Sequence, residues 1–259
     1  MHNLKLWSPS NKLNNIYKFT KSLNLNSNFN TYNELHKWSI KNKNDFWKAV
    51  WKFTNIIGNL KGNAFYHNKN FIECKFFKES KLNYTENCLS RNDNKDAIIF
   101  YSEKNFKRSI SWKQLKENVF KISYFFRSNN ISKNDRIVAV LPNIPETVMC
   151  FLATAQIGAI WSSCSSDFGA QAIIDRFKQI KPKVLIITDY YYYNNKKINT
   201  TKIIPFILKN ISSIKKIIVI PYENKKAKLS DSFDYVEWIT ILESQNKYDI
   251  FEKYDFDHP

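Results

Sequence analysis

Short apolar runs alternate with amphipathic segments from residue 97 onward. Runs rich in Ile and Val predict strands, and apolar residues repeated every three or four positions predict helices. The predicted strands cover residues 97–101, 107–110, 136–141, 184–188 and 217–220, with further strand segments at 159–162 and 234–238. Predicted helices cover residues 147–157, 167–180 and 202–210, and another follows the capping pair Ser111 and Gln114 and ends near Asn129.

This alternation predicts an α/β fold with a mostly parallel sheet that helices cover on both faces. The run Arg136–Leu141 is apolar after its first residue, as a strand buried on both faces requires. Residues 1–75 have a different texture, rich in Asn, Lys and aromatic residues. Within them, Phe46, Trp47, Val50 and Trp51 fall at helical spacing. We therefore expect an N-terminal helical cap over residues 1–75 and a larger domain over 76–259.

Composition narrows the function classes. The net charge is +17, but only five of the 40 basic residues are Arg, and the Lys residues are scattered along the chain. Nucleic-acid binders usually gather basic residues in a patch and use Arg, so the charge is expected to be mainly solvated surface. The chain has four Gly, too few for a glycine-rich phosphate loop.

The cysteines and the apolar stretches point to a cytoplasmic protein. Four Cys fit no zinc-binding spacing, so they are expected to be reduced thiols. His36 has no second ligand at metal spacing, so we expect no metal site. Neither a signal-peptide core nor a stretch long enough to span a bilayer occurs, which predicts no membrane partner.

The segment 158–169 is the first candidate for chemistry. We expect it to run from a strand end through a hydroxyl-rich loop into a helix start, where ligands bind in open α/β sheets. The candidate substrate-pocket residues are Trp161, Ser162, Ser163, Cys164 and Ser165. The plainer alternative is that Ser165, Ser166 or Asp167 only caps the next helix. A nucleophile here would need a base, and all four His are remote in sequence, which argues against a hydrolase.

The second candidate is the segment 189–197, which follows the predicted strand 184–188. It places Tyr193 beside Lys196 and Lys197. Aromatic rings can stack on a base while ammonium groups neutralise phosphate, which suits a nucleotide-like ligand such as CoA and also single-stranded RNA. The alternative is a solvated loop with half-packed tyrosines.

Several motifs in order carry a family likeness. They are W-S-P near the start, L-H-K-W-S (35–39), F-W-K-A-V (46–50), L-N-Y-T-E-N (82–87), P-N-I-P-E (142–146), G-A-I-W-S-S-C-S-S-D-F-G (158–169) and D-R-F-K-Q-I-K-P-K-V-L (175–185). Together they resemble the N-terminal region of acetoacetyl-CoA synthetases, within the adenylate-forming acyl-CoA synthetases. Three departures stand out: Ser166 replaces a usual Pro, Thr85 a usual Ala and Asn195 a usual Gly.

The resemblance implies a two-step ligation. The acetoacetate carboxylate attacks the α-phosphate of ATP, releasing pyrophosphate with Mg²⁺ screening the charge, and the CoA thiolate then displaces AMP. By position, Tyr193, Lys196 and Lys197 resemble the loop with basic contacts to CoA, and Trp161–Ser165 resembles the loop near the acyl end. The small-molecule partners would be acetoacetate, ATP and CoA, with no nucleic acid.

The resemblance also implies an incomplete domain. In the family, a segment like F-D-H-P at 256–259 precedes the loop that holds the ATP phosphates. We therefore expect the N-terminal part of an acetoacetate–CoA ligase, with no catalytic residue in this chain and no activity alone. The alternatives are another short-chain acyl-CoA synthetase and a non-catalytic module that binds CoA or RNA.

Overall fold

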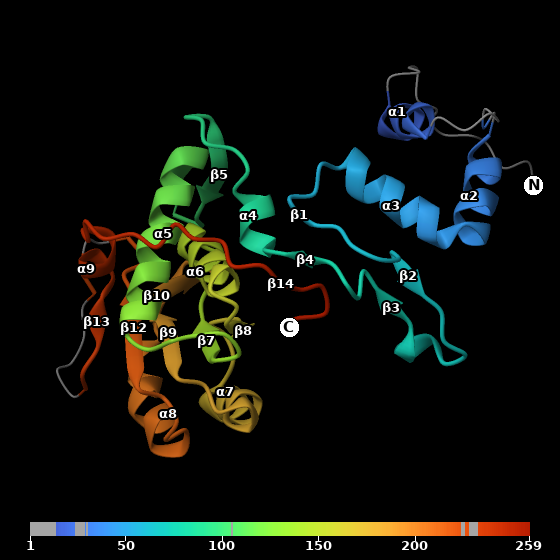
Figure 1. The fold of residues 1–259 in the computed structure, drawn as a ribbon. Helices are drawn as coiled ribbons and strands as arrows, with labels where there is room; N and C mark the ends of the chain where they lie inside the picture. The colour runs from blue at the N-terminus through green and yellow to red at the C-terminus, as the bar shows by residue number, and fades with distance from the viewer. Residues whose placement is uncertain (1–13, 24–28, 30, 105, 224–225, 228–232) are drawn as a thin grey trace, which may run out of the picture. The chain divides into compact units, whose positions relative to one another are not determined.

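The computed structural model describes residues 14–23, 29, 31–104, 106–223, 226–227 and 233–259 (Figure 1). The chain divides into two compact units. The first comprises Met1–Leu82 with Asp255–Asp257, and the second comprises Asn83–Tyr254 with His258–Pro259.

Three helices precede the short strands of the first unit. They are α1 (Asn15–Ser22), α2 (Tyr32–Lys41) and α3 (Lys43–Phe53). The helix predicted around residues 46–54 is confirmed as α3. Short strands that the sequence did not indicate follow it: β1 (Gly58–Asn59) pairs with β4 (Lys81–Leu82), and β2 (Phe65–Tyr66) pairs with β3 (Lys75–Phe76). Trp51, Ala64 and Phe77 form the core of this unit.

A five-stranded parallel sheet forms the centre of the second unit. Its order is β13 (Val236–Glu237), β12 (Lys216–Ile220), β9 (Val184–Thr188), β7 (Arg136–Val140) and β8 (Ile160–Cys164). Every neighbouring pair runs parallel. The predicted α/β fold with a parallel sheet is therefore confirmed.

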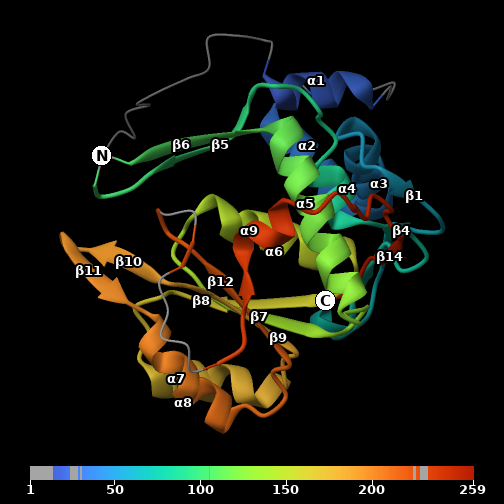
Figure 2. The same ribbon diagram turned by 90° about the vertical axis from the view of Figure 1, so that its left-hand side faces the viewer.

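Helices cover both faces of this sheet (Figure 2). On one face lie α5 (Trp112–Ser128), α6 (Pro145–Gln156) and α9 (Trp238–Leu242), packed against Ile137 and Ala139 of β7. On the other face, α7 (Ala170–Phe177) and α8 (Ile204–Asn210) pack against Val138 and Val140. Alternate residues of one strand thus enter two separate cores.

The remaining elements of the second unit are short. They are α4 (Tyr84–Cys88), the hairpin of β5 (Asp96–Tyr101) with β6 (Lys107–Ser111), the hairpin of β10 (Tyr190–Tyr193) with β11 (Lys196–Asn199), and β14 (Tyr254–Asp255), whose second residue belongs to the first unit. The two strands predicted before α5 are present, but they pair with each other in antiparallel fashion. The segment at 234–238 yields a two-residue strand, and Trp238 already begins α9.

A buried polar seam ties the end of α6 to the segment near residue 250. The Asn83 amide donates to the carbonyls of Gln156 and Glu252, each at 2.9 Å. The Gln156 amide donates to the Tyr248 carbonyl at 2.8 Å and accepts from the Ser123 hydroxyl at 2.8 Å. Buried amides need such partners, so Asn83, the first Asn of L-N-Y-T-E-N, has a structural role.

The Glu of P-N-I-P-E also has a structural partner. The Arg108 guanidinium, on β6, donates to both carboxylate oxygens of Glu146 at 2.6 and 2.8 Å. Glu146 lies near the start of α6 and is 5% exposed. This bidentate ion pair holds the β5–β6 hairpin against α6.

We predict that Arg108→Met destabilises the protein strongly, because it leaves a buried carboxylate without its cation. The expected loss is about 3–5 kcal/mol of unfolding free energy. Lys247→Met is the matched control, since its ion pair with Glu117 is exposed and the expected loss is below about 1 kcal/mol. Urea denaturation measures both losses, and equal losses would contradict a dominant role for the Arg108–Glu146 pair.

Candidate functional site at the carboxyl edge of the sheet

The carboxyl ends of the central strands lie on one edge of the sheet. Val140 at the end of β7 pairs with Cys164 of β8 and with Ile187 of β9, and Ile220 of β12 pairs with Thr188. Both segments singled out from the sequence leave the sheet at this edge. In open parallel sheets this edge is where ligands bind.

The strand predicted at 159–162 continues through Cys164 as β8, which corrects the start of the predicted hydroxyl-rich loop. Trp161, Ser162, Ser163 and Cys164 each pair with a residue of β7, and only Ser165 lies beyond the strand. Trp161 packs edge-on against Phe151 at 6.2 Å between ring centroids. Its indole N–H donates to the Ser163 hydroxyl at 3.1 Å, so these two side chains share one face of the strand.

The helix after this segment starts later than predicted. It begins at Ala170, and its N-cap is Gly169, without a side-chain capping bond. The idea that Ser165, Ser166 or Asp167 caps this helix was therefore wrong. Residues 165–169 connect the end of β8 to the start of α7.

Cys164 is unsuited to nucleophilic chemistry. Its side chain is 8% exposed and belongs to the core beneath α7 and α8. Burial raises the pKa of the thiol to about 11. The thiol is therefore neutral at physiological pH, which agrees with the argument against a hydrolase.

The two departures Ser166 and Thr85 are both buried, with opposite consequences. The Thr85 hydroxyl donates to the Leu152 carbonyl of α6 at 2.6 Å. Ser166 is 7% exposed, and its hydroxyl has no hydrogen-bond partner among the described residues. The site around Ser166 thus suits an apolar side chain better than a hydroxyl.

The Tyr-rich segment is a β-hairpin, which corrects the second predicted loop. Tyr193 pairs with Lys196 across a two-residue turn of Asn194 and Asn195. Both turn residues have positive φ, +48° and +61°. Tight hairpin turns require this left-handed conformation, and Asn adopts it more readily than other residues except Gly. Asn195 therefore preserves a turn at the position where Gly is usual.

A buried carboxylate holds the base of this hairpin. One oxygen of Asp189 accepts the N–H groups of Tyr190 and Tyr222, both at 2.9 Å, which links the ends of β9 and β12. Its other oxygen is buried without a hydrogen-bond donor among the described residues. Burial raises the pKa of Asp189. Asp189 opens the predicted segment 189–197 but was not among its candidate contacts, although an acidic residue directly after an apolar strand is a detectable pattern.

The three candidate CoA contacts have different surroundings. The Lys197 ammonium lies 3.5 Å from the ring centroid of Tyr190, whose hydroxyl donates to Glu223 at 3.0 Å. Tyr193 is 64% exposed at the hairpin end. Lys196 is also exposed, and no ion-pair partner for it occurs in the described part of the chain. Lys196 is therefore the better placed of the two cations to meet a phosphate.

The two candidate segments leave the sheet at the same edge, one after β8 and the other after β9. Burial, together with the charge of Asp167, raises the pKa of Tyr191 in β10. The edge thus combines exposed Ser163 and Ser165 with an aromatic and cationic hairpin.

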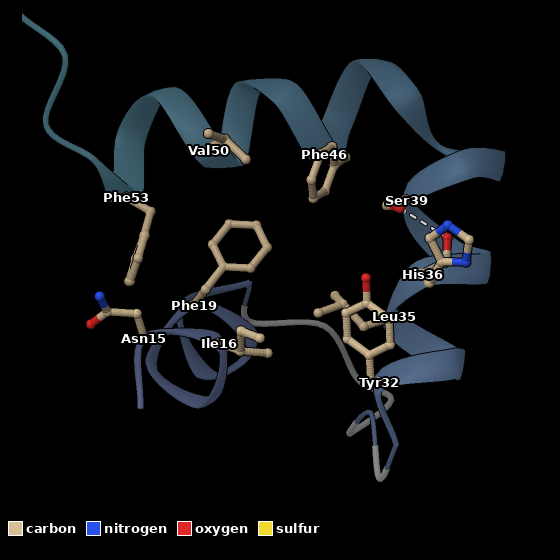
Figure 3. Close-up of a pocket in the computed structure, with 10 residues that line it drawn as sticks. All are labelled: Asn15, Ile16, Phe19, Tyr32, Leu35, His36, Ser39, Phe46, Val50 and Phe53. Atoms are coloured by element: carbon tan, nitrogen blue, oxygen red, sulfur yellow. Dashed lines mark hydrogen bonds between the residues drawn. The ribbon is translucent and has the colours of Figure 1, made fainter. Parts of the chain in front are cut away.

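A separate pocket of about 310 Å³ lies within the first unit, between α1, α2 and α3 (Figure 3). Phe19, Phe46 and Phe53 point into it, and the ring of Tyr32 stacks on His36 at its rim with 6.0 Å between centroids. The described residues that line it include no lysine or arginine, so they do not favour an anionic ligand. Among the described residues, no cluster of three His, Cys, Asp or Glu could hold a metal ion.

Comparison with known proteins identifies the family. The model of the family described as AMP-binding enzyme matches residues 85–247, well over half of the chain. The chain belongs to this family. The match covers the parallel sheet, both hairpins and the helices on both faces of the sheet. No helix in the described part of the chain is long and apolar enough to cross a membrane.

Curated proteins similar to this chain include acetoacetyl-CoA synthetases. An acetoacetyl-coenzyme A synthetase of Rhizobium meliloti is 34% identical over 89% of this chain and 36% of its own length. The acetoacetyl-CoA synthetase of Gallus gallus is 32% identical over 100% of this chain and 41% of its own length. A solved acetoacetyl-CoA synthetase from Streptomyces lividans matches with a TM-score of 0.82 at 28% identity, over 90% of this chain and 36% of that one. The chain therefore spans about two fifths of these relatives, and the family resemblance drawn from the motifs is confirmed.

We predict opposite effects from removing the two buried hydroxyls. Ser166→Ala should stabilise the protein by about 1 kcal/mol, because it removes a polar group that is buried without a partner. Thr85→Ala should cost about 1 kcal/mol, because it removes a satisfied hydrogen bond. Thermal unfolding compares the two variants, and a loss of stability in Ser166→Ala would show that its hydroxyl has a partner.

Proposed function

We propose that this chain forms part of an AMP-forming acetoacetate–CoA ligase. The reaction consumes acetoacetate, ATP and CoA and yields acetoacetyl-CoA, AMP and pyrophosphate. The observation that carries the proposal is the match of nearly the whole chain to proteins named acetoacetyl-CoA synthetase. The sequence W-S-S-C-S of residues 161–165 favours this acid over other short-chain acids.

Within the ligase, residues 1–75 would form the helical cap and residues 76–259 part of the adenylation domain. We assign Lys196, Lys197 and Tyr193 to the CoA side of the site. Exposure of Lys196 and Tyr193 at the hairpin end supports this assignment, since a Lys suits a phosphate at the solvent edge. Lys197 contributes its charge from over the Tyr190 ring.

We assign Trp161–Ser165 to the surroundings of the acyl group. Trp161 and Ser163 present an aromatic face and a hydroxyl on the same side of β8. Such a pairing suits a small keto acid, which offers a short carbon chain and a carbonyl oxygen that accepts a hydrogen bond. Cys164 faces the core on the other side of the strand and would only support the pocket.

ATP and Mg²⁺ would depend mainly on other residues of the ligase. Phosphoryl chemistry needs several donors and a metal around the phosphates. We assign no catalytic residue to this chain, because none of its positions matches the family motifs that hold the ATP phosphates. The proposed partners are small molecules, in the cytoplasm, without nucleic acid.

The activity can be tested in a chimaera in which this chain replaces the matched region of the Streptomyces lividans protein. We expect AMP release that depends on acetoacetate and exceeds release with butyrate by at least about tenfold, because a pocket that hydrogen-bonds the keto group discriminates against its absence. Equal release with butyrate would favour another short-chain acyl-CoA synthetase. A folded chimaera that releases no AMP with any acid would contradict the ligase.

The CoA contact can be tested on the 259-residue chain itself. Lys196→Ala should weaken CoA binding by about five- to tenfold, the value of one exposed charge-assisted contact, and leave binding of pantetheine unchanged. Lys209→Ala is the control, an exposed Lys on α8. Calorimetry measures all three proteins. Tighter binding of single-stranded RNA than of CoA would instead support the RNA-binding module.

A further inference from the structure

The turn of the β10–β11 hairpin is held by a carboxylate from another hairpin. The two oxygens of Glu103 accept the backbone N–H groups of Asn194 and Asn195, at 3.3 and 3.0 Å. Glu103 lies between β5 and β6, about ninety residues earlier in the chain. Figure 2 shows the two hairpins extending in the same direction from the sheet.

This contact fits the conformation of the turn. Asn194 and Asn195 both have positive φ, and two successive N–H groups reach one carboxylate. Successive backbone N–H groups in a turn form a concave site for an anion. The carboxylate therefore stabilises the left-handed turn that brings Tyr193 opposite Lys196.

Further contacts join the same two hairpins. The Lys104 ammonium lies 5.5 Å from the ring centroid of Tyr192. Phe100 of β5 meets Tyr222, which follows β12, edge-on at 6.3 Å between centroids, and Tyr222 packs in turn against Tyr192 of β10 at 5.9 Å. The Arg108–Glu146 pair in turn fastens the β5–β6 hairpin to α6. The β5–β6 hairpin that carries Glu103 is therefore itself anchored to α6.

We propose that Glu103 is a positioning residue for CoA binding: it fixes the hairpin turn so that Lys196 and Tyr193 are held ready for the ligand. This inference rests on the proposed function, because it takes CoA as the ligand of the hairpin. Glu103 does not touch the ligand. By holding the turn, it reduces the conformational entropy that the hairpin loses when CoA binds.

The sign of the effect separates positioning from simple electrostatics. Glu103 carries a negative charge near a site for phosphate, so charge alone predicts that its removal tightens CoA binding. Positioning predicts the opposite, because the turn loses its anchor. Only one of these two results can hold for Glu103→Ala.

The turn itself is tested by amide hydrogen exchange of the 259-residue chain. Glu103→Ala should speed exchange at Asn194 and Asn195 by about tenfold, the loss expected for hydrogen bonds to a charged acceptor. Glu103→Gln keeps one carbonyl oxygen as acceptor, so its exchange rates at these amides should lie between those of the wild type and of Glu103→Ala. Amides in the centre of β9 should not change. Unchanged exchange at both Asn residues would overturn the proposal.

Calorimetry with CoA tests the link to the ligand. Glu103→Ala should weaken CoA binding by about fivefold and Glu103→Gln by less. Asp175→Asn is the matched control, since it removes an exposed acidic charge on α7 whose carboxylate, among the described residues, accepts from Gln171 of the same helix. Tighter binding in Glu103→Ala would overturn positioning in favour of repulsion. If no protein binds CoA, the proposed CoA contact fails, while faster exchange would still show that Glu103 holds the turn.

Discussion

Burial of the central strands on both faces is the constraint on which the second unit depends. In β7, Ile137 and Ala139 enter the core beneath α5 and α6, whereas Val138 and Val140 enter the core beneath α7 and α8. A strand in this position must be apolar throughout, and its neighbours must run parallel because helices connect them. Parallel pairing then brings the carboxyl ends of β7, β8, β9 and β12 to one edge.

At that edge, buried polar side chains take the place of apolar ones. Asp189 and Thr188 lie there with less than 2% exposure, and the carboxylate of Asp189 satisfies two N–H groups while one of its oxygens stays without a donor among the described residues. Such groups cost stability unless something else requires them. Here they join two strand ends and fix the base of the Tyr-rich hairpin, so the rigid sheet is extended to the residues we assign to CoA.

The sequence predicted the parts of the fold that depend on apolar periodicity. The strand at 184–188 and the capping pair of α5 appear where expected, because both follow from local chemistry. The strand β8 was partly taken for a loop, since an edge strand with exposed Ser163 lacks a continuous apolar run. The hairpin was missed because its turn uses two Asn and no Gly. No local pattern indicates the bond from Glu103 to that turn, because the partners are distant in sequence.

The three departures from the family motifs show which features of the edge tolerate change. Asn195 keeps the required backbone conformation, and Thr85 finds an acceptor in the Leu152 carbonyl, so each new polar group is accommodated by what surrounds it. Ser166 is different, because its hydroxyl is buried without a described partner. A buried hydroxyl without a partner costs stability. The path from β8 to α7 carries Ser165 and Asp167 past the carboxyl end of β8, so its course constrains the site even where the side chain at 166 does not.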